Sequence, residues 1–164
     1  GAYRVGGDAV CLPFGDNAFD LLFSQIALLW MSTIEAVLDE VRRVLATGGA
    51  LVALEPDYGG MIEHPPELAS RDVWLSALAR AGADPLIGRK LPGLLSARGF
   101  DVRVSLFDTL YIPDPARFDF LRGLPLTDAE LAKLDCIERE AERYAAPWSQ
   151  VAHLPFLLIT AIRS

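Results

Sequence analysis

The chain has 164 residues, 52% of them hydrophobic, so it is long enough to bury one core and we expect a single domain over residues 1–164. Its 15 basic and 22 acidic residues give a net charge of −7, which argues against nucleic acid and anionic lipid as partners. The apolar stretches are too short to span a bilayer and no leader-like segment opens the chain, so we expect a cytoplasmic protein with no membrane partner.

The two cysteines, Cys11 and Cys136, lie far apart and belong to no CxxC or Cys/His pattern. This spacing indicates neither a disulfide framework nor a zinc site. We therefore expect no metal and interpret both residues as buried thiols.

The first third of the chain alternates between strand and turn patterns. Residues 3–5 resemble the end of a short strand, and residues 12–17 have the Pro, Gly and Asn content of a loop. Residues 19–24 form a nearly continuous apolar run, which is typical of a strand buried on both faces of a parallel sheet.

The clearest helix follows this strand. Ser32 and Glu35 have the spacing of a capping box, with Ser32 as the N-cap. The pair Gly48-Gly49 is expected to end the helix, and residues 50–54 form the next buried strand. The apolar residues in between follow a helical spacing and predict one buried stripe: Ile34, Val37, Leu38, Val41, Val44 and Leu45.

The remaining patterns predict further helices over 71–81, 91–98 and 131–145, and strands over 101–112 and 151–163. Asp114 is expected to cap a helix that starts with Pro115, and Thr127 to open a second capping box. Pro155 suggests a bulge or an edge in the last strand. This alternation predicts an α/β fold with a Rossmann-like, doubly wound and mostly parallel sheet.

Two segments carry a resemblance to a known family. Residues 7–20, beginning Gly7-Asp8-Ala9, resemble the G-D-A-x-x-L-P-F-x-D-x-x-F-D stretch of class I S-adenosylmethionine (SAM)-dependent methyltransferases. Residues 40–49 are similar to the same family's E-x-x-R-V-L-x-P-G-G turn, with Thr47 in place of the usual proline. Their order and spacing make the joint match fairly specific.

The resemblance implies a cofactor site for SAM. Asp8 would accept a hydrogen bond from the adenine amino group, and the Ala9 amide would donate to the adenine ring. Ser24 and Gln25 would contact the methionine part of SAM at the carboxyl end of a strand. Structural alternatives remain for both pairs, since Asp8 also suits a turn and Ser24 and Gln25 can satisfy backbone groups where the strand ends.

Candidate catalytic residues follow the next strand. Glu55 and Asp57 face the expected crevice and could hold a small-molecule acceptor or take a proton from it, and His64 lies a few residues later. Because methyl transfer from a sulfonium depends mainly on alignment, a dedicated base is optional. His153 is expected to be a core residue, and Arg89 to be solvated at a helix start or to bind a carboxylate-bearing substrate.

The family's glycine-rich cofactor turn is absent from these residues, because no two of the 13 glycines are two positions apart. We expect the fold to be incomplete, lacking an N-terminal βαβα portion, with the strand at 19–24 left as an unpaired edge. Three hypotheses follow: a fragment or split methyltransferase subunit completed by an N-terminal chain, a non-catalytic interaction domain, or a degenerate relative that pairs edges in a homodimer.

Overall fold

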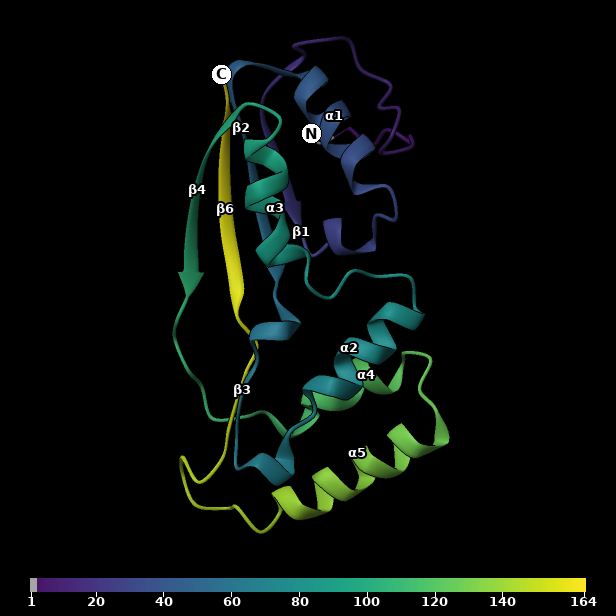
Figure 1. Ribbon diagram of the computed structural model, residues 1–164, viewed down its shortest axis with the longest axis vertical. Coiled ribbons are helices and arrows are strands. Elements are labelled where there is room, and N and C mark those ends of the chain that lie inside the picture. The colour runs from purple at the N-terminus through teal and green to yellow at the C-terminus, as the bar shows by residue number, and fades with distance from the viewer. Residues whose placement is uncertain (1–2) are drawn as a thin grey trace.

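The computed structural model describes residues 3–164, and its centre is a four-stranded mixed sheet with the order β1-β2-β6-β4 (Figure 1). The strands are β1 (Phe19–Gln25), β2 (Leu45–Pro56), β6 (Phe156–Arg163) and β4 (Phe100–Phe107). β1 runs parallel to β2, and both β2 and β4 run antiparallel to β6. The α/β Rossmann-like fold is therefore confirmed, but the described sheet is mixed rather than mostly parallel.

The helices α1 (Ile34–Val44) and α3 (Ile87–Ser96) pack on one face of this sheet (Figure 1). The predicted apolar stripe of α1 is confirmed, since all its members except the partly buried Ile34 lie in the core. Strand residues on the same face, such as Leu51, Ala53 and Ile159, are almost completely buried. One part of the core thus lies between these two helices and the two central strands, and the same cluster continues into residues 68–78 and 118–137.

The opposite face of the sheet is not covered by a helix among residues 3–164, and its apolar side chains reach the surface. Leu21 and Phe23 on β1 are 58% and 64% exposed, and Phe107 on β4 is 50% exposed. The expectation that residues 19–24 are buried on both faces was therefore wrong. As expected, β1 has an unpaired edge within the described part of the chain.

Two segments far apart in the sequence form a second layer below the sheet, which we call the cap (Figure 1). The first, residues 57–86, contains β3 (Ile62–His64) and α2 (Arg71–Arg80). The second, residues 108–155, contains α4 (Asp119–Arg122), α5 (Asp128–Ala141) and β5 (Val151–His153). Strands β3 and β5 pair with each other, so the two segments are joined by backbone hydrogen bonds. The short 3-10 helices are η1 (Leu28–Trp30), η2 (Tyr58–Gly60), η3 (Pro66–Leu68) and η4 (Pro115–Phe118).

Several helix ends agree with the sequence predictions. Thr127 and Glu130 form the expected capping box of α5, and the Asp114 carboxylate accepts from the Ala116 amide at the start of η4. Helix α2 also lies where it was expected. Helix α3 begins at Ile87, four residues before its expected start.

Other local predictions were wrong. Residues 3–5 form no strand, and Ser32 does not cap α1, whose N-cap is Thr33 without a side-chain hydrogen bond. Helix α1 passes directly into β2 at Leu45, so Gly48 lies within that strand, at φ 79°, rather than at a helix end. Strand 101–112 stops at Phe107, and Pro155 divides the last predicted strand into β5 and β6.

Both cysteines are exposed rather than buried. Cys11 belongs to an open loop. Cys136 lies on α5, where Leu134 and Ile137 face the core. Because Cys136 is two residues from Leu134 along the helix, its side chain points towards solvent. No helix in the described range 3–164 is long and apolar enough to cross a membrane.

Candidate functional site

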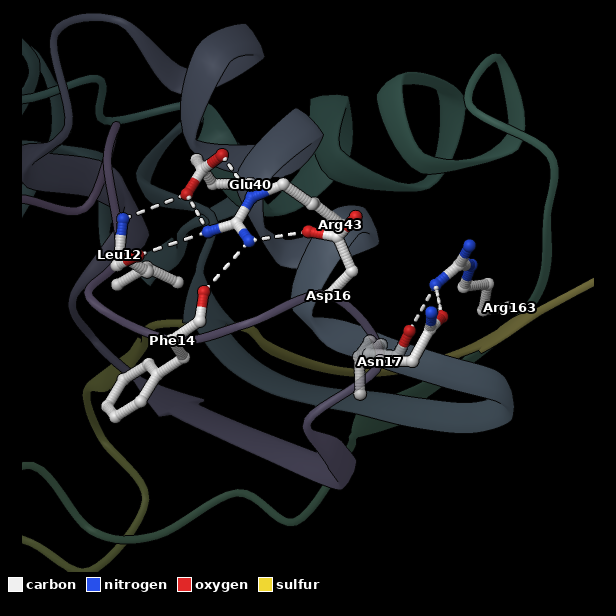
Figure 2. A network of polar contacts seen from close by, with 8 residues as sticks. Leu12, Phe14, Asp16, Asn17, Glu40, Arg43 and Arg163 are labelled. Carbon is white, nitrogen blue, oxygen red and sulfur yellow. Dashed lines mark hydrogen bonds and ion pairs between the residues drawn. The ribbon is translucent and has the colours of Figure 1, made fainter.

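The loop of residues 8–17 is fixed to α1 by Glu40 and Arg43 (Figure 2). Arg43 donates to the Leu12 and Phe14 carbonyl oxygens at 3.0 and 2.8 Å, and its guanidinium pairs with Asp16 at 2.8 Å. Glu40 accepts from the Leu12 amide at 2.8 Å. These bonds hold residues 12–16 of the loop, so the shape of that part is set by the helix beneath it.

The same two residues bind each other, which explains the E-x-x-R spacing. Arg43 donates from Nε and Nη2 to the two carboxylate oxygens of Glu40, both at 2.8 Å. The hydrogen bonds from Arg43 and from the Leu12 amide lower the pKa of Glu40 from 4.5 to about 2. Glu40 and Asp16 in turn raise the pKa of the Arg43 guanidinium. Both groups therefore stay charged over the whole physiological pH range.

The last residue of the loop is bound to the end of β6. Arg163 donates to the Asn17 side-chain oxygen at 2.7 Å and also to the Leu45 carbonyl (Figure 2). Asn17 itself has a φ of 56°, in the left-handed region that asparagine tolerates better than most residues. The loop thus enters β1 in one defined direction.

Asp8 and Ala9, the two predicted adenine contacts, lie at the start of this loop. Asp8 Oδ1 accepts from the Val10 amide at 3.1 Å, and its backbone carbonyl accepts from the Cys11 amide at 3.0 Å. Ala9 packs partly against the core. This is the turn that the alternative interpretation of Asp8 described, and it leaves the carboxylate exposed at the surface.

Ser24, Gln25 and Glu55 come together at the carboxyl ends of β1 and β2. Ser24 is paired with Ala53 and Gln25 with Leu54 in the parallel ladder. Glu55 is completely buried, and its Oε1 accepts from the amides of Ala27 and Leu28 at 3.1 and 2.9 Å and from the Ser24 hydroxyl at 3.5 Å. Glu55 therefore shapes the turn that follows β1.

Glu55 is an unusual carboxyl group. Its Oε2 is buried and has no hydrogen-bond partner among the described residues. Burial raises the pKa of Glu55, although its backbone donors and Ser24 oppose that shift.

Ile26 occupies the same turn with a φ of 50°. This left-handed conformation is a genuine outlier for a β-branched residue, and such strain is concentrated at functional sites. The Ile26 amide donates to the Leu54 carbonyl at 2.9 Å, so the ladder holds it in place. The sequence pattern gave no signal for this residue.

The remaining candidate catalytic residues lie in different surroundings. Asp57 is only 8% exposed and forms a forked pair with Arg89, whose Nε and Nη2 lie 2.8 Å from its two oxygens. Asp57 also raises the pKa of Arg89. Arg89 thus binds a carboxylate of the chain itself. His64 is exposed at the end of β3 in the cap, and His153, which faces β3 from β5, is half-buried rather than fully buried.

A cavity of about 210 Å³ lies within the cap, between its two segments. Tyr58, three residues after Glu55, forms part of its wall, and both segments of the cap contribute to the lining. Its lining is mainly apolar, with Trp74, Phe118 and Leu154 among the residues, and it includes Arg117. Sequence reasoning missed this cavity, because its lining comes from both segments of the cap. The described residues contain no group of three or more His, Cys, Asp or Glu side chains that could hold a metal ion.

Comparison with known proteins places the first part of the chain in a family. Residues 3–53 match the family profile described as a methyltransferase domain. An uncharacterised protein of Escherichia coli K12, YafE, is 38% identical over 72 residues, covering 44% of this chain and 31% of that protein. A malonyl-[acyl-carrier protein] O-methyltransferase of Coxiella burnetii is 44% identical over 46 residues, covering 28% of this chain and 16% of that protein.

The fold has relatives among solved structures. The crystal structure of a putative methyltransferase from Bacillus halodurans superposes with a TM-score of 0.64 at 18% identity, covering 98% of this chain and 76% of that chain. The chain thus shares almost its whole fold with that protein, while it spans about a third or less of the two curated relatives. The matched segment, residues 3–53, is thus similar to a methyltransferase domain, and the fold of the chain agrees with that of the solved structure.

Proposed function

We propose that this chain provides the adenine side of a SAM site and the acceptor cavity for methyl transfer to a small molecule. The observation that carries the proposal is the loop 8–17, which matches the family segment and whose residues 12–16 are held by Glu40 and Arg43. A preformed loop loses little conformational freedom when a ligand binds, which favours a ligand-binding role over a simple connection.

The residues fit the cofactor in part. Asp8 and Ala9 would hold the adenine, and Ser24 and Gln25 would contact the methionine part beside the strained turn at Ile26. Bound SAM would supply the methyl group as an activated sulfonium. The glycine-rich turn is not among the 164 residues, so we propose that a further segment completes the site, either in a longer chain or as a separate N-terminal subunit.

The acceptor would bind between the ends of β1 and β2 and the cap. Because alignment supplies much of the rate of an in-line methyl transfer, the main task of these residues is to place the acceptor and exclude water. We propose a positioning role for Glu55, which holds the turn after β1, and for Asp57, which is neutralised by Arg89. His64 remains the candidate for proton removal, on the cap side of the site.

The test is calorimetric titration of SAM and S-adenosylhomocysteine into the chain, alone and together with a segment that carries a family glycine-rich turn. Binding that requires the added segment is the expected result. The Asp8→Asn variant should then bind SAM about tenfold more weakly, whereas the exposed Asp108→Asn control should bind normally. Absence of binding in the completed protein would refute the proposal.

A second candidate function rests on the unpaired edge and open apolar face of β1. An exposed edge strand with apolar side chains invites pairing with another strand, which would suit a non-catalytic interaction domain or a homodimer. Sedimentation velocity separates these possibilities. A dimer that never binds SAM would favour this candidate, and a monomer at all concentrations would exclude the homodimer.

A further inference from the structure

The aromatic cavity in the cap is lined by one basic residue, Arg117, which forms no ion pair with the described residues. Tyr58 and Trp74 pack with their ring centroids 5.1 Å apart, and Trp74 stacks on Phe120 at 6.0 Å. Phe118 forms another wall and carries the Arg117 guanidinium 4.6 Å above its ring centroid. The cavity therefore combines flat apolar surfaces with a cation at one side.

The other polar groups of the lining are already engaged or neutral. The Ser70 hydroxyl donates to Glu63 at 2.7 Å, so it is bound within the cap. Burial raises the pKa of Tyr58 to about 12, which keeps its phenol neutral at physiological pH. Arg117 is thus the only charged residue of this lining.

Arg117 has unused donors. Its Nη1 donates to the Asp114 carbonyl and its Nη2 to the Gln150 side chain, both at 3.2 Å, out of five N–H groups. No carboxylate oxygen of residues 3–164 lies within 4 Å of its nitrogens, in contrast to Arg43, Arg89 and Arg122. A half-buried guanidinium with spare donors beside an apolar cavity is suited to a charge-assisted hydrogen bond with a ligand.

From this arrangement we infer that the cavity binds a small carboxylic acid with an apolar, ring-sized body, whose carboxylate pairs with Arg117. The volume of about 210 Å³ exceeds that of a cavity known to hold benzene, which is about 150 Å³. A single ring with a short acidic side chain therefore fits. The identity of this ligand as the methyl acceptor rests on the proposed function. The binding of the ligand to the cavity does not depend on that proposal.

The charges around Arg117 favour a monoanion. Glu138, Glu63 and Asp114 all act on the guanidinium through space, and Glu138 and Glu142 line a second hollow on its other side. These carboxylates would repel a doubly charged phosphate more strongly than a singly charged carboxylate. The class of ligand is accordingly a carboxylic acid rather than a phosphate ester.

The experiment is an NMR titration of the chain with phenylacetate, phenylacetamide and phenyl phosphate, following the indole signal of Trp74 and the backbone amides. Phenylacetate should shift Trp74, while the amide and the phosphate bind more weakly. The Arg117→Gln variant should lose about ten- to hundredfold in affinity for phenylacetate. Arg117→Lys should retain part of the affinity, and Arg139→Gln, on the surface of α5, should bind like the unmodified chain.

Any one of four results would overturn the inference. They are equal binding of the acid and the amide, normal binding of phenylacetate by Arg117→Gln, tighter binding of the phosphate, and no response of Trp74. If Arg117→Gln fails to fold, the comparison of acid with amide and the Arg117→Lys variant still decide it. The titration contains no SAM, so its outcome is independent of the SAM titration. If the acid binds and SAM does not, the inference about the cavity stands and the proposed methyl transfer is rejected.

Discussion

Glu55 at the end of β2 holds the turn after β1 through the amide of Leu28, which lies 2.9 Å from its Oε1. The two residues are 27 positions apart, so this bond joins the carboxyl ends of neighbouring strands. The turn that it fixes includes the strained Ile26. The first prediction follows from the burial of this carboxyl group.

Burial raises the pKa of Glu55 above its ordinary value of 4.5, so the folded chain favours the protonated form. Its contribution to stability is complete below pH 4.5 and is lost as the pH rises through the folded-state pKa. The Glu55→Gln variant lacks this titration and should gain stability relative to the unmodified chain as the pH rises above 4.5. Urea unfolding of both proteins between pH 4 and 8 measures the difference.

A difference in stability that stays constant over this pH range would contradict the raised pKa. Glu55→Ala is the companion variant, because it leaves the Ala27 and Leu28 amides without their acceptor. It should cost about 1–3 kcal/mol below pH 4.5, and this cost should shrink as the pH rises, as for Glu55→Gln.

Loss of Arg43 should release the loop 8–17 without unfolding the sheet. In the Arg43→Met variant, hydrogen exchange at the Leu12 amide should accelerate, while exchange at Leu51 in the central strand stays slow. Arg139→Met on α5 is the control, since within residues 3–164 Arg139 donates only to a carbonyl of its own helix. Unchanged protection of Leu12 would show that the loop does not depend on Arg43.

The same variant should also change the titration of Glu40. The pKa of this carboxyl group is lowered to about 2, with Arg43 as the largest cause, so its contribution to stability is present above pH 4.5 and is lost as the pH falls through about 2. In Arg43→Met the NMR titration of Glu40 should move back towards 4.5. A midpoint that stays near 2 would assign the shift to the Leu12 amide instead.

The pair between Asp57 and Arg89 ties the end of β2 to the first turn of α3. Arg89→Met leaves the buried Asp57 carboxylate without its partner and should cost about 1–3 kcal/mol in the free energy of unfolding. The double variant Asp57→Asn with Arg89→Met should recover part of that loss. Lys90→Met, which breaks the exposed pair with Asp84, should cost at most about 1 kcal/mol.

The open face of β1 should control association of the chain. We expect the unmodified protein to associate reversibly, and Phe23→Glu to weaken that association by placing a charge on the exposed strand. Phe107→Glu on β4, the opposite edge strand, is the matched control on the same open face, at 50% exposure. If sedimentation equilibrium gives the same association for both variants, β1 is not the contact.

Elements with a strong local signal were predicted well from the sequence. The stripe of α1 and the capping box at Thr127 depend only on residues within one helix, and both are present. Ser32 shows the limit of such a signal. Its capping box has the correct letters, but the helix starts one residue too late for Ser32 to cap it.

Features built from distant residues could not be predicted in this way. The role of Glu55 depends on the amide of Leu28 in a neighbouring turn, and Arg89 finds Asp57 across 32 positions. The family pattern located Asp8 and the pair Glu40 and Arg43, but it did not show that the pair holds the loop. The Arg117 cavity needs both cap segments, which no single stretch of sequence reveals.

The two-part construction of the cap has a consequence for engineering. Trp74 stacks on Phe120, Tyr144 binds Glu67, and Arg80 binds Glu130, so each segment buries its side chains against the other. A chimera that imports only residues 57–86 or only residues 108–155 from a relative would bring together surfaces that did not evolve as partners. Exchange of the cavity between such proteins requires both segments to be grafted together, with the strands of the sheet left in place.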